Sequence, residues 1–507
     1  MKLKNILRYG VRVGLMTGAV FVADGYGQSP AATPKPLALN DVASALQSSR
    51  AGLPITNRVL IKQVEERGVD FDISDETISA LKKGGATDEL IERIRRSICD
   101  KFVTLAQQCS DEDHDCRLSH FTKALTVHPD DALVLADRGD TYFEKGDFES
   151  ALADLSRAIE LDPKNAEAFG DRGNTYARLG KRDLALQDYD RAIVLDSKEP
   201  TYIFNRATTH YNLGNYKAAI TDYSKYLLMK PSDTEGYTFR GDAYYAAGDY
   251  ALAIRDYTKA ITLGAKDPSI FLSRGEAYTA AGKFELAVRD YTKAIEIDRK
   301  NAAAYRSRGW AYFKLKNMDQ AMADFALAIS TDPGAADNYI NRGLVFKERK
   351  SLEAAVADFS KAIEIEPKSA PAYYYRGQIF AGLQDYESAI VDFTKAIELD
   401  EKDGDFYIER GSVYIDIEEY NKALSDYNKA IELSPKLSAA FTNRGLIYQR
   451  LNDHQKAIAD ASTAIRLDPR DPIPYGNRAI SYEAIGDHRR AEADRKRAQT
   501  LEKLQKP

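Results

Sequence analysis

Apolar, aromatic and small residues recur with a fixed period from Ala132 to Gln505, and the period equals the interval from Arg138 to Arg172. Within each period they occupy positions 4, 8 and 11, and then positions 20, 24 and 27. Intervals of three or four residues place side chains on one face of a helix, so each period predicts two amphipathic helices that pack together. No insertion interrupts the spacing, and we therefore expect eleven helical hairpins in residues 132–505.

The residue types at these positions suit close packing of two antiparallel helices. Position 20 is Ala in all eleven periods, and position 27 is Ala in all but one, where Tyr226 replaces it. Position 8 is Gly in nine periods, with Ala207 and Ala479 in the other two. Positions 4 and 11 are large, and position 24 is aromatic in the middle periods. Small residues facing large ones allow the two helices to interlock.

Gly and Pro mark the expected ends of these helices. Gly in the middle of a period can adopt the left-handed conformation that ends a helix, and Pro near the end of a period cannot continue the second helix. The residues are Gly146, Gly180, Gly214, Gly248, Gly282 and Gly486, and Pro163, Pro231, Pro333, Pro367, Pro435 and Pro469.

Two charged residues interrupt the apolar pattern in every period: Arg at position 7 and Asp at position 23. We expect them to form ion pairs rather than to be independent exposed charges. The levels of the helices suggest that Asp of one period meets Arg of the next, although Asp494 has no following period and would pair better within its own. Partly buried pairs of this kind would specify register more than stability.

The fixed period and the Arg followed by Gly or Ala resemble the tetratricopeptide repeat family, whose helix-turn-helix unit has about 34 residues. The resemblance covers residues 132–505, and it implies an all-α fold, a right-handed superhelical α-solenoid whose first helices line a concave groove. Arg at position 7 and Asp at position 23 depart from the usual family pattern. The Arg residues are Arg138, Arg172, Arg206, Arg240, Arg274, Arg308, Arg342, Arg376, Arg410, Arg444 and Arg478.

Residues 98–131 extend the same frame backwards as a degenerate repeat. Phe121, Ala124 and Pro129 stand at positions 24, 27 and 32, but the Arg-Gly pair is missing. The end of a solenoid has no neighbour to bury its outer face, so a modified repeat suits that place. We therefore expect residues 98–131 to cap the array.

The N-terminal part divides into three further segments. Residues 1–27 combine a basic start, an apolar stretch and small residues at a cleavage point, which predicts a signal peptide and hence a periplasmic or secreted protein. Residues 28–40 are expected to be a flexible linker. Residues 41–97 have Leu, Ile and Val at helical spacing and predict a small module of three or four short helices.

Cys109 and Cys116 occupy positions 12 and 19 of the degenerate repeat, on facing ends of its two helices. In an exported protein we expect them to form a disulfide, and Cys99 to be a buried apolar residue. A metal site that adds His114 and His120 is the alternative, but the spacing matches no standard zinc pattern. We accordingly assign no metal ligands and no cofactor.

Composition and motifs exclude several classes of function. The net charge of -6 gives no basic bias for binding phosphates, so nucleic acid is not an expected partner. No stretch after the signal peptide is long and apolar enough to cross a membrane. The chain lacks a phosphate-binding Gly-rich loop, HExxH and GxSxG, and no segment outside the repeats is suited to a catalytic domain. We therefore expect a protein that is not an enzyme.

The resemblance places the variable positions of the first helices on the groove, and these positions predict where a protein or peptide partner binds. They are acidic and polar in the first two repeats and aromatic in the middle ones. Aromatic side chains typify interaction hot spots, and Asn amides can bond a peptide backbone, although rings at these positions also serve packing alone. The candidates are Asn205, Phe239, Tyr245, Trp310, Phe313, Asn341, Tyr374 and Tyr375.

A non-catalytic scaffold or adaptor of the cell envelope is the function that these features favour. A carbohydrate- or envelope-polymer-binding component of a secretion machine is an alternative, because aromatic rings also stack on sugars. A holdase-like chaperone with broad affinity for unfolded chains is another. The sequence names neither the partner nor the oligomeric state.

Overall fold

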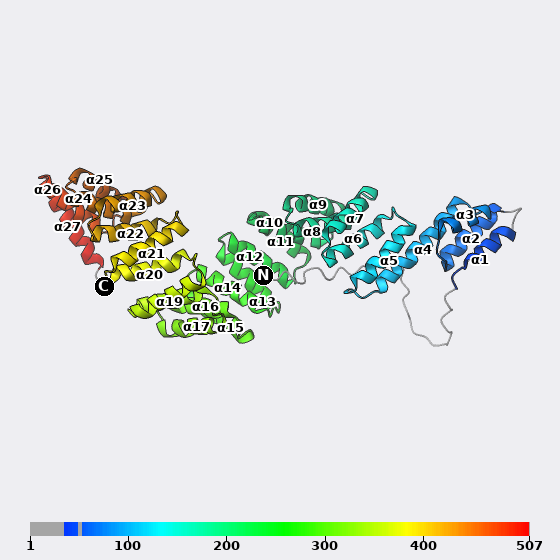
Figure 1. Cartoon of the computed structure of the whole chain (residues 1–507), viewed down its shortest axis with the longest axis horizontal. Coiled ribbons are helices and arrows are strands. Elements are labelled where there is room, and N and C mark those ends of the chain that lie inside the picture. Colours follow the sequence, from blue (N-terminus) through cyan, green and yellow to red (C-terminus); the bar gives the residue numbers. More distant parts are fainter. Residues whose placement is uncertain (1–34, 49–52, 506–507) are drawn as a thin grey trace. The chain divides into compact units, whose positions relative to one another are not determined.

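The computed structural model describes residues 35–48 and 53–505, and the described chain consists of 27 helices. It divides into two compact units, unit 1 up to Ser197 and unit 2 from Lys198. The predicted signal peptide, residues 1–27, lies outside the described residues. The expected all-α solenoid of helix-turn-helix repeats is confirmed (Figure 1).

Unit 1 begins with a small helical module. Helices α1 (Leu39–Ser48), α2 (Leu53–Arg67) and α3 (Asp75–Lys83) gather beside the first half of α4 (Asp88–Gln108) in Figure 1. Their core contains the buried side chains of Val42, Leu46, Leu60, Val64 and Ile94.

The module differs at both ends from the predicted boundaries. Leu37, which was assigned to the linker, pairs with Val69 and is buried in the core. The module therefore begins before residue 41. At its other end, α4 runs without a break through the predicted boundary at residues 97 and 98, because no helix-ending residue occurs there. The second half of α4 and helix α5 (His114–Val127) form the degenerate repeat.

The eleven repeats each contribute a first and a second helix, as the period predicts. Unit 1 holds the first two repeats. Their helices are α6 (Ala132–Lys145), α7 (Phe148–Leu161), α8 (Ala166–Arg178) and α9 (Arg182–Leu195).

Unit 2 holds the other nine repeats. Its first helices are α10 (Pro200–Asn212), α12 (Thr234–Ala246), α14 (Pro268–Ala280), α16 (Ala302–Lys314), α18 (Ala336–Glu348), α20 (Ala370–Gly382), α22 (Gly404–Asp416), α24 (Ser438–Arg450) and α26 (Ile473–Ala484). Its second helices are α11 (Tyr216–Met229), α13 (Tyr250–Thr262), α15 (Phe284–Ile297), α17 (Met318–Thr331), α19 (Leu352–Ile365), α21 (Tyr386–Leu399), α23 (Tyr420–Leu433), α25 (His454–Leu467) and α27 (His488–Gln505).

Position 8 packs directly on the ring at position 24 of the same repeat. A Cβ atom added at Gly343 would lie only 2.8 Å from Cε1 of Phe359. In the tenth repeat position 24 is the small Ala461, and a Cβ at Gly445 would find no atom nearer than 3.3 Å. A side chain at position 8 therefore has less room in the seventh repeat than in the tenth, although the third repeat places Ala207 beside the buried ring of Tyr223.

A left-handed residue ends the first helix of every repeat. Gly146, Gly180, Gly214, Gly248, Gly282 and Gly486 have positive φ, as the sequence predicts. The other five repeats place a non-Gly residue there with φ near +60°, a conformation that costs such residues some strain. These residues are Lys316, Lys350, Gln384, Glu418 and Asn452.

The Arg at position 7 and the Asp at position 23 do pair, but within one repeat rather than between repeats. In the fifth repeat, Nε and Nη2 of Arg274 each donate a bond of 2.7 Å to the carboxylate of Asp290. The same bidentate pair occurs in all eleven repeats, and the Asp is buried each time. The prediction that Asp meets the next repeat was wrong. Positions 8 and 24 face each other across the hairpin, so the adjacent positions 7 and 23 face each other as well.

In nine of the repeats the third guanidinium nitrogen of the Arg donates to position 25 of the preceding repeat. Nη1 of Arg274 donates to the Thr258 hydroxyl at 3.0 Å, and Nη1 of Arg376 donates to the Ser360 hydroxyl at the same distance. Both acceptors stand at position 25 of the preceding repeat. Ala326 stands there in the sixth repeat and offers no acceptor to Arg342.

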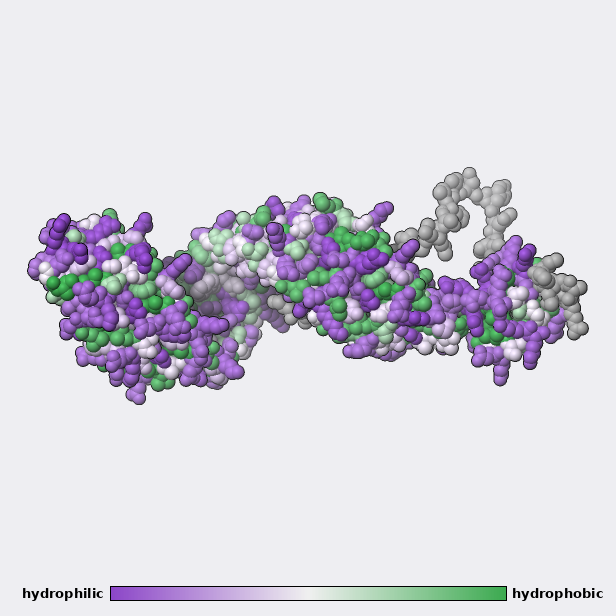
Figure 2. All heavy atoms as spheres, turned by 90° about the horizontal axis from the view of Figure 1, so that it is seen from above, coloured by the Kyte–Doolittle hydropathy of each residue, from purple (hydrophilic) through white to green (hydrophobic). Residues whose placement is uncertain are grey.

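Hydrophilic side chains dominate the face of the chain shown in Figure 2, where they surround small, separate hydrophobic patches. Among the described residues, no helix is long and apolar enough to cross a membrane.

Candidate functional site

The first helices of unit 2 lie next to one another. Helix α12 contacts α14, α14 contacts α16, and α16 contacts α18, in addition to the contacts that each makes with its own second helix. We call the surface that these helices form the first-helix face. Positions 6, 9 and 12 of successive repeats meet on this face.

A cavity of about 430 Å³ opens on the first-helix face over the fourth to seventh repeats. Four consecutive first helices contribute to it, and most of the lining side chains carry a hydrogen-bonding group. The lining residues are Tyr245 from α12, Glu276, Thr279 and Ala280 from α14, Arg306, Ser307 and Trp310 from α16, Asn341 from α18, and Tyr291 from the second helix α15.

Glu276 and Arg306 give the cavity one charge of each sign. Burial raises the pKa of Glu276, and the positive charge of Arg306 partly opposes that rise. The nearest carboxylate to the Arg306 guanidinium among the ion pairs of the described residues is that of Asp337, at 3.7 Å. The Arg306 guanidinium therefore interacts with two carboxylates, those of Asp337 and Glu276.

Trp310 takes part in packing as well as in the cavity. Phe313 stacks on it with the ring centroids 5.3 Å apart, and the Lys314 ammonium lies 4.6 Å from the Trp310 ring centroid. Trp310 also packs beside the buried Phe325 and Val345. The indole therefore already has partners for much of its surface.

The hydroxyl groups of the Tyr residues at position 24 reach the first-helix side of the repeat, a feature not expected from the sequence. Tyr257 donates to the carboxylate of Asp242 at 2.7 Å, and the Tyr427 hydroxyl lies 2.8 Å from that of Ser412. Both partners stand at position 9. Where position 24 is Phe, position 9 is Trp310, Leu344 or Gln378. This correlation between positions 9 and 24 is visible in the sequence. It could have been used to predict which repeats have hydrogen-bonded side chains at these two positions.

Two of the predicted aromatic residues belong to a separate cluster in the eighth repeat. Tyr374 and Tyr375 lie 5.3 Å apart between ring centroids, and Tyr374 packs 5.0 Å from Phe406. Tyr375 stacks on the buried Phe359 at 5.8 Å. These rings fill space between helices, so the structure does not bring them to the cavity.

Phe239 and Asn205 also lie apart from it. The Phe239 ring packs against Phe204 at 5.4 Å and against the buried Tyr223 at 6.1 Å. Asn205 lies on α10, where its carbonyl accepts the Thr209 hydroxyl at 2.9 Å. Of the predicted groove residues, Tyr245, Trp310 and Asn341 line the cavity, and Phe313 supports Trp310.

Hydrogen-bonded polar side chains connect the first helices α18, α20 and α22. The Lys347 ammonium on α18 donates to Gln378 on α20, and the Gln378 amide donates to the Glu409 carboxylate on α22 at 2.8 Å. These residues stand at positions 12, 9 and 6 of successive repeats. Tyr245, Glu276 and Ser307 stand at the same positions, 12, 9 and 6, of the fourth, fifth and sixth repeats, and all three line the cavity.

The first repeat carries acidic side chains on its first helix, as the sequence predicts. Arg117 pairs with Glu144 at 2.5 Å. Burial of the Asp140 carboxyl, together with the negative charge of Glu144, raises the pKa of Asp140 to about 7. Asp140 therefore changes charge near neutral pH.

The cysteine pair that the sequence singled out forms a disulfide. Cys109 and Cys116 are joined, with 6.0 Å between their Cα atoms, and the bond connects the end of α4 to the first turn of α5. Cys99 is free and fully buried, and burial raises the pKa of its thiol to about 11. Such a thiol stays protonated and unreactive.

Comparison with protein families identifies the repeats. Residues 139–180, 241–282, 275–316, 343–384 and 411–452 match a model described as TPR repeat. Three models described as tetratricopeptide repeat match residues 173–240, residues 370–403 and 438–471, and residues 302–334. Together the matches cover more than half of the chain. The chain belongs to the tetratricopeptide repeat family. A tetratricopeptide array of this kind supports a role as a scaffold for protein–protein interaction.

Solved structures match the chain over different shares of its length. MamA is 29% identical over 32% of this chain and 95% of its own, with a TM-score of 0.30. A tetratricopeptide repeat protein from Parabacteroides merdae is 26% identical over 46% of this chain and 93% of its own, with a TM-score of 0.39. Yeast Tom70 is 16% identical over 81% of this chain and 97% of its own, with a TM-score of 0.41. No curated protein matches the chain in sequence.

Proposed function

We propose that this protein is an exported, non-catalytic scaffold that binds an extended segment of a partner protein along the first-helix face of unit 2. The cavity over the fourth to seventh repeats carries the proposal, because the first helices of four consecutive repeats contribute polar side chains to its lining. The partner segment would lie across these helices and insert a side chain into the cavity.

The polar groups of the cavity match what a peptide offers. An extended segment presents backbone N–H donors and carbonyl acceptors, and the Asn341 amide supplies both kinds of partner. Ser307 and Thr279 can donate or accept, whereas Glu276 only accepts and Arg306 only donates. A segment that satisfied these groups would replace their bonds to water, and one that did not would leave them buried and unpaired. The cavity therefore selects among segments by polar complementarity.

The contacts of Trp310 favour a protein partner over a carbohydrate. A sugar would stack on an open aromatic face, but Phe313 and Lys314 already contact the Trp310 ring. Tyr245 and Tyr291 also line the cavity, and the Tyr291 hydroxyl lies 3.0 Å from that of Thr279.

The basic and apolar start of the chain supports export, together with the disulfide between Cys109 and Cys116. Disulfides persist mainly in oxidising compartments. Cell fractionation would test export: we expect the shortened, mature chain outside the cytoplasm, and a full-length chain retained in the cytoplasm would overturn that part of the proposal.

Site-specific photo-crosslinking tests the binding face. A photoreactive phenylalanine replaces Tyr245 at the cavity or, as a control, Glu296 on the second helix of the fifth repeat. We expect a discrete protein adduct from the first position and not from the second. Adding Glu276→Ala and Asn341→Ala should abolish the adduct. Identical adducts from both positions, or none from the cavity position, would refute binding at this face.

A further inference from the structure

The degenerate repeat lacks the Arg–Asp pair that all eleven full repeats contain. In its frame, position 7 is Thr104 and position 23 is His120, so neither the Arg nor the Asp of the usual pair is present. The Thr104 hydroxyl donates instead to the carbonyl of Asp100 at 2.8 Å. His120 thus occupies the place of a buried, doubly bonded carboxylate without the guanidinium that would bond to it.

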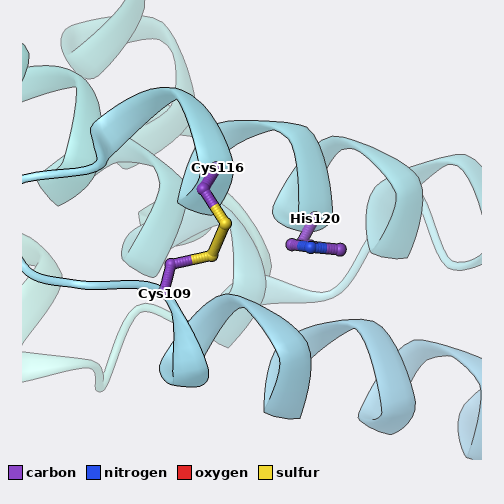
Figure 3. Close-up of side chains that lie close together, drawn as sticks. All are labelled: Cys109, Cys116 and His120. Carbon is purple, nitrogen blue, oxygen red and sulfur yellow. A yellow bond between two sulfur atoms is a disulfide. The ribbon is translucent and has the colours of Figure 1, made fainter.

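The His120 imidazole lies beside the disulfide instead. Cys116 and His120 project from successive turns of α5, and Cys109 approaches from the end of α4 (Figure 3). One nitrogen of His120 and the two sulfur atoms all lie within 4.8 Å of one another. The ring is held in place by Phe102, whose centroid lies 6.3 Å away in a stacked arrangement.

The imidazole carries a polar atom that the described part of the fold leaves unsatisfied. His120 Nδ1 is shielded from solvent and has no hydrogen-bond partner among the described residues. Buried polar atoms are nearly always bonded, and an unbonded one indicates a missing water, an ion or a chemical role. Nδ1 of His114, His128, His210 and His454 is likewise buried without a hydrogen-bond partner among the described residues, so His120 is distinguished by its closeness to the two sulfur atoms.

Two thiolates and one imidazole are a donor set for a thiophilic metal ion. Zn²⁺ binds sulfur at about 2.3 Å and imidazole nitrogen at about 2.0 Å, so the ligand atoms of a tetrahedral site lie about 4 Å apart. In the disulfide the two sulfur atoms are bonded and the His120 nitrogen lies within 4.8 Å of both, so after reduction the sulfur atoms need only separate to about 4 Å to complete this spacing. Cys116 is also in the first turn of α5, where the helix dipole favours a thiolate.

We propose that Cys109, Cys116 and His120 form a redox-gated site for a thiophilic divalent metal ion such as Zn²⁺. The disulfide and the metal exclude each other, because both use the same sulfur atoms. A dithiol reductant transfers two electrons and two protons to the disulfide and becomes a disulfide itself. Metal binding then releases the two thiol protons, with His120 as the third ligand and water in the fourth position.

The reverse step is also balanced. Glutathione disulfide takes two electrons from the zinc-bound thiolates and, with two protons, becomes two glutathione thiols. The Cys109–Cys116 bond re-forms and the Zn²⁺ ion is released. The site therefore couples the redox state of the degenerate repeat to its metal content, and this coupling does not depend on the binding face proposed for unit 2.

Zinc binding by the intact chain tests the proposal. The protein is reduced with a phosphine, loaded with Zn²⁺, passed over a desalting column, and assayed for metal and for affinity by competition with a chromogenic chelator. We expect one Zn²⁺ per reduced chain and none in the oxidised chain. Cys116→Ser should abolish binding, and His120→Gln should weaken it by about tenfold or more. Glutathione disulfide should release the metal as two thiols disappear.

His128→Gln is the matched control, because His128 lies at the end of the same helix and bonds Glu92 at 3.0 Å. It should bind zinc like the parent. Helical circular dichroism must show each variant folded, and Co²⁺ loading should give thiolate charge-transfer bands that Cys116→Ser lacks. Zinc retained equally by the Cys116→Ser variant would indicate adventitious surface binding and overturn the proposal. Zinc binding unchanged by His120→Gln would overturn it too.

Discussion

Replacing Asp290 by Ala tests whether the Arg–Asp pair holds each hairpin together. The substitution removes two bonds of 2.7 Å from Arg274, whose side chain is 15% exposed against 8% for Asp290. Removing one partner of a buried pair typically costs 3–5 kcal/mol, because the other charge is left uncompensated. Arg274 keeps its bond to Thr258 and its contact with the Tyr278 ring, so we expect the lower limit, about 3 kcal/mol.

The assay must resolve one repeat, since long arrays need not unfold in a single step. Hydrogen exchange of the segment 268–297, read by mass spectrometry, reports the local opening equilibrium. A loss of about 3 kcal/mol increases that equilibrium roughly 100-fold. Denaturation by guanidinium, followed by circular dichroism, gives the corresponding change in global stability.

Two further variants separate the pair from other effects. Glu296→Ala removes an exposed ion pair to Lys293 in the same helix and should leave exchange unchanged. Arg274→Met combined with Asp290→Leu removes both charges and should recover most of the lost stability. The reasoning is refuted if Asp290→Ala changes the local free energy by less than about 0.5 kcal/mol, or if the double variant is no better than the single one.

Three other predictions follow from the packing and electrostatics. Gly343→Ala should destabilise the protein by about 1–3 kcal/mol, because the added methyl group would clash with the Phe359 ring. Gly445→Ala should be neutral or stabilising by about 0.5–1 kcal/mol. Guanidinium denaturation of the two variants measures the difference, and equal effects would contradict the packing argument. Ala326→Ser offers an acceptor to Arg342 and should stabilise by about 0.5–1 kcal/mol, with slower exchange in the seventh repeat; no change would show that this bond is dispensable. Because the pKa of Asp140 is raised to about 7, the native state holds its proton more tightly than the unfolded state, so stability should fall as pH rises from about 4 to about 7. Asp140→Asn should remove that fall and be the more stable protein at pH 8, which melting curves across this range would show.

Much of the fold follows from short-range patterns. The fixed period, with small and large residues at set places, predicts every hairpin of the described array, because helix spacing and close packing are local requirements. The prediction that each Asp pairs with the Arg of the next repeat was wrong. The sequence nevertheless contained the information needed, because the contact between positions 8 and 24 places positions 7 and 23 of the same repeat opposite each other. The boundary at residue 97 failed because nothing in the sequence ends α4 there.

The candidate site was only partly predictable. Tyr245, Trp310 and Asn341, which the sequence names as groove candidates, line one cavity, but Glu276 and Arg306 were not recognised as members of the same cavity. Their proximity depends on the offset between consecutive repeats, which no single repeat encodes. The rings of Tyr374 and Tyr375 could not be assigned to packing without knowing that Phe359 and Phe406 lie beside them.

The closed Arg–Asp pair also bears on how such an array changes in length. Every repeat contains both the Arg and the Asp of its ion pair. In every repeat, Nη1 of the Arg is the atom that can bond to the preceding repeat. Adding or losing one whole repeat therefore leaves no charge stranded, and any repeat with a hydroxyl or amide at position 25 can precede any other. An array built in this way can be copied or shortened by in-register recombination without redesign of its junctions.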